Sequence, residues 1–282
     1  MRDLKATDYS YLELLNSELS IPEFESQFTK YSKNNNYFIK VIEKDNKIIA
    51  AGSLLIKPRF LKSMKYSGWI TNVYGEDKFI KEIVNKLIEN GKEMDCYLLD
   101  IILPNNSKSN ADSLNLNNTN LKPFYASTWN EREVYDDKTR LLEIDDYEKD
   151  FLDVMRNMYH VKDIQKKEFI THYQEYDKIK DYFIFIKELE GKIRATGSIY
   201  IYDDFFSLKR KGILEDIIVD HDYRLQNFSK LIIEELNLIA KKNNCYQFVG
   251  KIRKNKMDYC MNVFPTTEIL DLDHYIKFLK LK

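Results

Sequence analysis

The chain has 282 residues, of which 44% are hydrophobic and 32% charged, and its formal net charge is −1. This is the composition of a soluble globular protein of one or two domains, and it offers no general attraction for nucleic acid or membrane surfaces. No apolar run approaches the ~18 residues of a membrane span. Three cysteines and no apolar leader at the N-terminus favour a reduced, cytoplasmic protein over a disulfide-linked, secreted one.

The first predicted elements are two helices. Apolar side chains at helical spacing predict a helix over residues 8–19, and a second amphipathic helix follows over 23–31. The same succession returns later in the chain, over 147–158 and 165–173.

A strand hairpin follows each pair of helices, and here the chain repeats itself. Residues 37–54 and 182–199 are identical at nine of eighteen positions at a fixed offset of 145. Both segments predict two strands joined by a tight turn, because Asp45-Asn46 and Glu190-Gly191 tolerate the positive φ that hairpin turns often require. Self-similarity at so long a period predicts two tandem copies of one domain.

Each copy then continues with a strand, a long amphipathic helix and a strand that opens with Cys-Tyr. In copy one these are residues 68–74, residues 79–90 and the strand from Cys96. In copy two they are residues 212–219, residues 228–242 and the strand from Cys245. This order predicts an α/β (α+β) fold for each copy, with a mixed, largely antiparallel central sheet flanked by helices.

The asparagine-rich residues 104–120 are either a linker between domains or a long loop inside copy one. We favour the loop, because Phe124-Tyr125 after it resembles the position of Tyr259 in copy two. The predicted domains are therefore 1–138 and 139–282.

Copy two carries a recognisable run of residues. Residues 212–219 read GILEDIIV and lead into Tyr223-Arg224, then Lys230-Leu231-Ile232 and Cys245-Tyr246. This succession resembles the GNAT acyltransferase superfamily and, within it, the glucosamine-6-phosphate N-acetyltransferases. The openings of the copies, Asp146-Tyr147 and Tyr11-Leu12, resemble the start of the same family, so the resemblance covers most of both copies.

The resemblance implies a binding site for acetyl-CoA in copy two and no metal. The residues it implicates are Ile217, Ile218, Val219, Arg224, Leu225, Gln226, Asn227, Phe228, Ser229, Lys230 and Asn255. In the family, glycines let backbone N–H groups of the loop approach the CoA phosphates. Here Leu225, Asn227 and Ser229 replace those glycines, while Arg224 and Lys230 remain as cations.

In GNAT enzymes an amine attacks the thioester directly, so a base, an anchor for the amine and an acid for the leaving thiolate are needed. The resemblance implies that Glu215 and Asp216 hold and deprotonate the acceptor, and that Tyr259 protonates the thiolate. The other reading is a salt-bridged pair at a strand end and a packing tyrosine. Adjacent residues of a regular strand face opposite sides, so the two carboxylates should not both face the core.

Copy one departs further from the family pattern. Thr71-Asn72 replaces the acidic pair, and the loop before Phe79 is about five residues shorter. It keeps Arg59 and Lys62 where the family contacts the sugar phosphate, whereas copy two has Asp204 there. These basic residues are either phosphate ligands or solvated surface. Cys245 and Cys260 are predicted to pack as small apolar residues.

Together these features predict a tandem, internally pseudo-dimeric N-acetyltransferase that is a monomer or a homodimer and acts on small molecules. Its acceptor would be glucosamine 6-phosphate, on the route to UDP-N-acetylglucosamine, with the active centre in copy two and a degenerate copy one. One alternative changes the acceptor to another amino sugar, an amine or a protein N-terminus. Another is a non-catalytic scaffold, because every loop glycine is lost.

Overall fold

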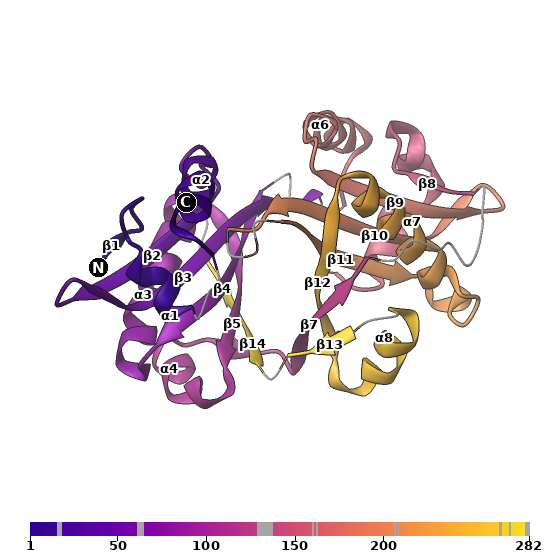
Figure 1. Cartoon of the computed structure of the whole chain (residues 1–282). Coiled ribbons are helices and arrows are strands. Elements are labelled where there is room, and N and C mark those ends of the chain that lie inside the picture. The colour runs from indigo at the N-terminus through magenta and orange to yellow at the C-terminus, as the bar shows by residue number, and fades with distance from the viewer. Residues whose placement is uncertain are drawn as a thin grey trace. The chain divides into compact units, whose positions relative to one another are not determined.

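The computed structural model describes residues 1–15, 19–60, 65–128, 138–159, 161, 163–205, 207, 209–264, 267–270 and 272–279. The chain forms two compact units (Figure 1). Unit 1 comprises Met1–Pro123, Phe205–Leu208 and Leu270–Lys282, and unit 2 comprises Phe124–Asp204 and Lys209–Ile269.

Unit 1 has a seven-stranded mixed sheet in the order β1-β2-β3-β4-β5-β14-β6. Only its β4/β5 pair is parallel among the strand pairs of the described residues. Its elements are β1 (Arg2–Asp3), α1 (Ser10–Leu14), α2 (Ile21–Tyr31), β2 (Tyr37–Lys44), β3 (Lys47–Pro58), β4 (Tyr66–Gly75), α3 (Asp77–Glu93), β5 (Cys96–Pro104), η2 (Asn105–Ser107), α4 (Lys108–Ser113), β6 (Asn117–Asn118) and β14 (Leu272–Phe278).

Unit 2 repeats this plan with the sheet order β13-β7-β12-β11-β10-β9-β8. Its elements are β7 (Leu121–Ser127), β8 (Thr139–Leu141), η3 (Ile144–Lys149), α5 (Phe151–Arg156), α6 (Lys166–Asp177), β9 (Tyr182–Leu189), β10 (Lys192–Asp203), β11 (Arg210–Val219), η4 (His221–Tyr223), α7 (Phe228–Lys242), β12 (Cys245–Arg253), η5 (Lys254–Lys256), α8 (Met257–Val263) and β13 (Thr267–Ile269). The two sheets confirm the predicted α/β class and the two tandem domains.

Short pieces of chain are exchanged between the copies. β14, from the end of copy two, completes the sheet of unit 1 between β5 and β6, and β7, from copy one, lies between β13 and β12 in unit 2 (Figure 1). Phe205 belongs to unit 1 as well, with its ring 5.7 Å from that of Phe24 and 5.4 Å from that of Tyr31. The boundary predicted at 138/139 divides the copies along the sequence, whereas the compact units interleave them.

The repeated glycine of the hairpin lets a helix pack closely on each sheet. A Cβ at Gly52 would lie 2.5 Å from Ile83 Cγ2 of α3, and one at Gly197 would lie 2.4 Å from Ile232 Cγ2 of α7. Any side chain at these positions would push the helix away. The glycine therefore sets the distance of α7, and with it the helix N-terminus, from the middle of the unit 2 sheet.

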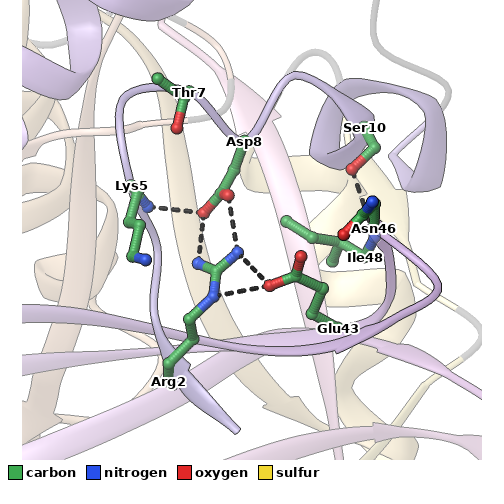
Figure 2. Close-up of a pocket in the computed structure, with 8 residues that line it drawn as sticks. All are labelled: Arg2, Lys5, Thr7, Asp8, Ser10, Glu43, Asn46 and Ile48. Atoms are coloured by element: carbon green, nitrogen blue, oxygen red, sulfur yellow. Dashed lines mark hydrogen bonds and ion pairs between the residues drawn. The ribbon is translucent and has the colours of Figure 1, made fainter.

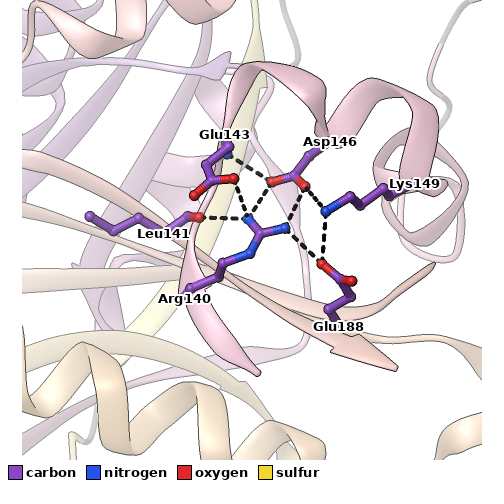
Figure 3. A network of polar contacts seen from close by, with 6 residues as sticks. All are labelled: Arg140, Leu141, Glu143, Asp146, Lys149 and Glu188. Carbon is purple, nitrogen blue, oxygen red and sulfur yellow. Dashed lines mark hydrogen bonds and ion pairs between the residues drawn. The ribbon is translucent and has the colours of Figure 1, made fainter. Parts of the chain in front are cut away.

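The copies also share polar contacts. In unit 1, Arg2 binds Asp8 and Glu43, and in unit 2, Arg140 binds Asp146 and Glu188 (Figures 2 and 3). The hydrogen bond from arginine Nη1 to aspartate Oδ2 is 2.7 Å long in unit 1 and 2.8 Å long in unit 2. We call each set of three side chains a clasp. In each unit it ties the start of the copy to the end of the first hairpin strand.

Residues 104–120 are structured. They form η2, α4 and β6, which match η5, α8 and β13 of copy two in order. Tyr259 is the third residue of α8, so its counterpart is Asn110 in α4, while Phe124 and Tyr125 lie in β7. The predicted likeness between Phe124-Tyr125 and Tyr259 is therefore wrong, because the short helix precedes the last strand in both copies.

Candidate acyl-transfer site

A β-bulge in β11 carries the acidic pair. The register of β10 against β11 shifts between Thr196↔Ile218 and Ser198↔Glu215, and Asp216 has a left-handed φ of 56°. Unit 1 has the same bulge at Asn72, with a φ of 53°. The extra residue interrupts the regular alternation of side chains. The sequence expectation that Glu215 and Asp216 face opposite sides therefore does not carry through this position.

The bulge lies beyond the point where two parallel strands are paired. The pairing of β11 with β12 runs from Arg210↔Cys245 to Ile213↔Val249, although the strands continue to Val219 and Arg253. Glu215 and Asp216 are two and three residues beyond Ile213 of this last pair. The backbone of β11 beyond Ile213 is therefore outside the ladder that joins it to β12 among the described residues.

Two residues that the sequence reading missed contact the acidic pair. Glu215 is 9% exposed, and its Oε1 lies 3.9 Å from Lys251 Nζ on β12. The Tyr159 hydroxyl, just after α5, donates a hydrogen bond of 2.5 Å to Asp216 Oδ1. Both partners come from other elements, and only their spatial neighbours distinguish them from the other lysines and twenty tyrosines of the chain.

The loop between β11 and α7, residues 220–227, keeps a glycine-like backbone without glycine. Leu225 has a φ of 75° and its side chain is fully exposed, and Asn227, the N-cap of α7, has a φ of 59°. Both values lie in the region that glycine adopts most easily. The Leu225 side chain points into solvent. Arg224 and Gln226 are exposed, and Ser229 and Lys230 are half-buried in the first turn of α7.

A stack of side chains supports this loop from within unit 2. Arg194 of β10 binds Asp220 at 3.0 Å and lies 4.5 Å from the ring of Tyr223. Tyr223 in turn stacks on Phe228, with ring centroids 6.1 Å apart. The side chains of Phe228 and Ile218 are buried, so these two predicted cofactor-binding residues can offer a ligand only their backbone groups. Ile217 and Val219 are half-buried.

α8 brings Tyr259 to the first turn of α7. The Tyr259 side chain is 44% exposed, and its hydroxyl lies 2.5 Å from the Ser229 hydroxyl. Asn255 is exposed in η5, directly before α8. The structure thus joins Tyr259 to the predicted phosphate loop, two segments that are 30 residues apart in the chain.

Unit 1 has the bulge but neither the acidic pair nor the long loop before its helix. Three residues, 76–78, lie between the end of β4 and Phe79, where unit 2 has eight, 220–227, between the end of β11 and Phe228, so this loop is five residues shorter, as predicted. α3 begins with Glu76 and Asp77, whose negative charges already occupy the positive end of the helix dipole. The Asn72 amide donates to Ser53 and Thr71 at 3.2 and 3.3 Å within its own hairpin.

The predicted phosphate ligands of copy one are only partly described. Arg59, directly after β3, is 8% exposed. Its backbone N–H donates a hydrogen bond to the carbonyl of Lys65. Lys62 lies outside the described residues. At the matching place in copy two, Asp204 is buried and pairs with Lys211 at 3.0 Å.

The three cysteines are buried thiols. Burial raises the pKa of Cys96 and of Cys245 to about 12 and the pKa of Cys260 to about 11. Nucleophilic cysteines have a lowered pKa, so Cys245 and Cys260 are packing residues as predicted, and Cys96 is a third. Within the described ranges, no three His, Cys, Asp or Glu side chains could hold a metal ion together, and no helix could span a membrane.

This combination, a bulged central strand, an unpaired stretch beside it and a helix N-terminus behind a loop, defines an acyltransferase of the GNAT fold. The Acetyltransferase (GNAT) family matches residues 143–257. A Dictyostelium discoideum protein, "Glucosamine 6-phosphate N-acetyltransferase 1", is 30% identical over 114 residues, which are 39% of this chain and 72% of that protein. The chain belongs to the GNAT N-acetyltransferase family.

Two further relatives extend the comparison. A Drosophila melanogaster protein named "Probable glucosamine 6-phosphate N-acetyltransferase" is 30% identical over 131 residues, 45% of this chain. The match spans 59% of the Drosophila protein's length. The solved GCN5-related N-acetyltransferase from Sphaerobacter thermophilus has 9% identity and a TM-score of 0.50, and the match covers 98% of this chain and 94% of that one. At that identity the likeness shows the fold alone, and it extends over both units.

Proposed function

We propose that the protein transfers the acetyl group of acetyl-CoA to the 2-amine of glucosamine 6-phosphate, on the route to UDP-N-acetylglucosamine. The observation that carries the proposal is the acidic pair at the bulge of β11, beyond the end of its pairing with β12. The names of the Drosophila and Dictyostelium relatives support this acceptor. Unit 2 is the catalytic unit in this proposal, and unit 1 is not.

The loop of unit 2 fits the phosphates of the acyl donor. The first N–H groups of a helix have no partner within the helix and favour an anion. Leu225 and Asn227 hold the backbone in the required left-handed conformation, and Arg224 and Lys230 add positive charge. Acetyl-CoA would supply the activated acyl group as a thioester.

The chemistry assigned to the side chains follows from this placement. Glu215 and Asp216 hold the ammonium of the acceptor, and a carboxylate takes its proton so that the nitrogen lone pair can attack the acyl carbon. The new C–N bond forms as the C–S bond breaks. Tyr259, beside Ser229, gives a proton to the sulfur that leaves. Arg59 and Lys62 as ligands of the sugar phosphate are part of the same proposal.

The loss of the loop glycines favours a second reading, a non-catalytic scaffold. Titration calorimetry with acetyl-CoA separates the two. We expect one site per chain, in unit 2, and a rise in thermal stability, because ligand at ~100 times its Kd adds about 2.7 kcal/mol. No heat and no shift at millimolar acetyl-CoA would favour the scaffold, and two sites per chain would contradict the assignment of unit 1.

The catalytic roles are tested by substitution. We expect Glu215→Gln, Asp216→Asn and Tyr259→Phe each to lower kcat at least about tenfold, since a positioned acid–base group contributes about 10²–10⁴-fold. The readout is thiol release with glucosamine 6-phosphate, other amino sugars and peptide N-termini as acceptors. Asp112→Asn, at an exposed position of α4 in unit 1, is the control. Full activity of the Glu215→Gln, Asp216→Asn double variant would refute the site.

A further inference from the structure

Copy two is longer than copy one between its clasp and its second helix. Asp8 and Asp146 occupy the same place in the two clasps, 138 residues apart. Tyr31 and Tyr176, whose hydroxyls accept from the N–H groups of Ile39 and Ile184, are 145 residues apart. The difference is seven residues, by which copy two is the longer between the clasp and Tyr176. We call residues 157–165 of this stretch the connecting segment.

The described ends of the connecting segment are fixed. The Asn157 side chain donates to the carbonyls of Asp153 and Val154 at 3.2 Å, which closes the end of α5. The N–H of Tyr159 donates to the carbonyl of Met155, a buried residue of the same helix. At the other end, the Tyr147 hydroxyl donates to the carbonyl of Ile164 at 3.2 Å.

These contacts hold Tyr159 in place, and they bring its hydroxyl to Asp216. Its hydroxyl donates to Asp216 Oδ1, and both side chains are half-buried, so solvent still reaches them. In copy one the residue at the bulge is Asn72, bound within its own hairpin, and the sequence from residue 12 to residue 30 contains no tyrosine. The copy with the carboxylate is thus also the copy with the extra chain that delivers a hydroxyl to it.

We propose that Tyr159 is a positioning residue of the acceptor site, an inference that rests on the proposed function. A carboxylate has two oxygens and can accept several hydrogen bonds. The bond from Tyr159 occupies Oδ1 and fixes the plane of the carboxylate, so that Oδ2 is directed to one place. A primary ammonium bound there is held by a charge-assisted hydrogen bond whose direction the protein has set.

The amine acceptor therefore depends on Tyr159 for its binding, and the acyl donor does not. Removal of the hydroxyl leaves the carboxylate free to rotate, which weakens the acceptor complex and the transition state by a similar amount. Such a loss raises KM for the acceptor and leaves kcat nearly unchanged. A direct effect on proton transfer would lower kcat.

The experiment measures steady-state kinetics of full-length Tyr159→Phe with acetyl-CoA and glucosamine 6-phosphate varied separately. We expect KM for the acceptor to rise about tenfold, the usual scale of a hydrogen bond to a charged group. We expect kcat and KM for acetyl-CoA to change less than about twofold. In the background of Asp216→Asn, Tyr159→Phe should have no further effect, since the group it positions is lost.

Tyr147→Phe is the matched control, because it removes a tyrosine hydroxyl that holds the same connecting segment without touching Asp216. An equal rise of the acceptor KM in Tyr147→Phe would show that loosening of the segment is the cause and would overturn the proposal. An unchanged acceptor KM in Tyr159→Phe, with active wild-type enzyme, would overturn it alone. Wild-type protein that acetylates no amine would overturn the proposed function and this inference together.

Discussion

Leu225 has a left-handed backbone conformation that is unfavourable for a branched side chain. Its side chain is fully exposed, so no burial of apolar surface offsets this unfavourable conformation. Unfavourable backbone conformations persist where the surrounding structure imposes them, often at functional sites. Here the Arg194–Tyr223–Phe228 stack holds the loop, and Leu225 adopts a conformation that glycine would adopt without strain.

Replacing Leu225 by glycine should relieve this strain. We expect Leu225→Gly to raise the free energy of unfolding by about 1 kcal/mol, the scale of the left-handed penalty for a residue with a Cβ. Affinity for acetyl-CoA should not fall. Urea denaturation and calorimetry provide the two measurements. Gln226→Gly is the control, since Gln226 is also exposed but does not have a positive φ, and it should lose stability.

Single residues show where sequence reasoning stops. Glu215, Asp216, Tyr259 and the loop cations were accessible from motif spacing, because they follow one another along a recognisable pattern. Tyr159 and Lys251 were not, because their relation to the acidic pair exists only after α5 and β12 pack beside β11. Among twenty tyrosines, no local signal separates Tyr159 from the rest.

At the scale of elements, local periodicity predicted much of the structure. α7 spans Phe228–Lys242 as predicted. The hairpin strands, predicted over 37–43, 48–56, 182–188 and 193–202, differ from these bounds by one or two residues. Hydrophobic patterns along 8–15 residues determine these elements, so they are visible without the fold. The clasps were not predicted, because Arg2 and Glu43 are 41 residues apart and their pairing depends on the finished sheet.

The clasp of unit 1 makes the free energy of unfolding depend on pH at acidic values. Although burial raises the pKa of Asp8, hydrogen bonds from Arg2 and from the Lys5 amide hold that pKa below its ordinary value. A carboxylate with a lowered pKa in the folded state stabilises the protein above its unfolded pKa of ~3.9, and this contribution is lost as pH falls through the folded pKa. Lys149 and Arg140 lower the pKa of Glu188 in the same way in unit 2.

Asp8→Asn should therefore destabilise the protein by about 2 kcal/mol near pH 7, since a buried hydrogen-bonded ion pair is broken. The difference from wild type should shrink as pH falls below ~3.9, because Asp8 of the unfolded chain then binds a proton that the folded state takes up only at lower pH. Urea unfolding at pH 7 and pH 3.5 measures both values. Asp112→Asn, at an exposed position of α4, serves as control. A difference that is the same at both pH values would contradict the role of the charge.

At the scale of the whole molecule, the exchange of strands links the two units through more than one connection. The repeat predicted two copies, and the order of strands within each follows from its hydrophobic pattern. The exchange of β7 and β14 could not be predicted, because a terminal strand has the same sequence pattern whichever sheet it joins. The connection that precedes a terminal strand determines which sheet the strand can reach.

A fragment of residues 139–282 should therefore fail to fold cooperatively, because it lacks β7, which lies between β13 and β12. A fragment of residues 121–269 contains every strand of the unit 2 sheet, and we expect it to retain more structure. Circular dichroism with thermal melting compares the two with the full-length chain. A sharp unfolding transition of 139–282 at the temperature of the full-length protein would show that β7 is dispensable.

The position of β14 has a consequence for biosynthesis. Residues 272–278 are made last among the described strands, yet they occupy the interior of the sheet whose first strand begins at Arg2. While the ribosome is still translating copy two, β5 is an open edge with unpaired backbone groups. Unit 1 thus begins first and is completed last, and nascent chains that stall within copy two should engage chaperones through that edge.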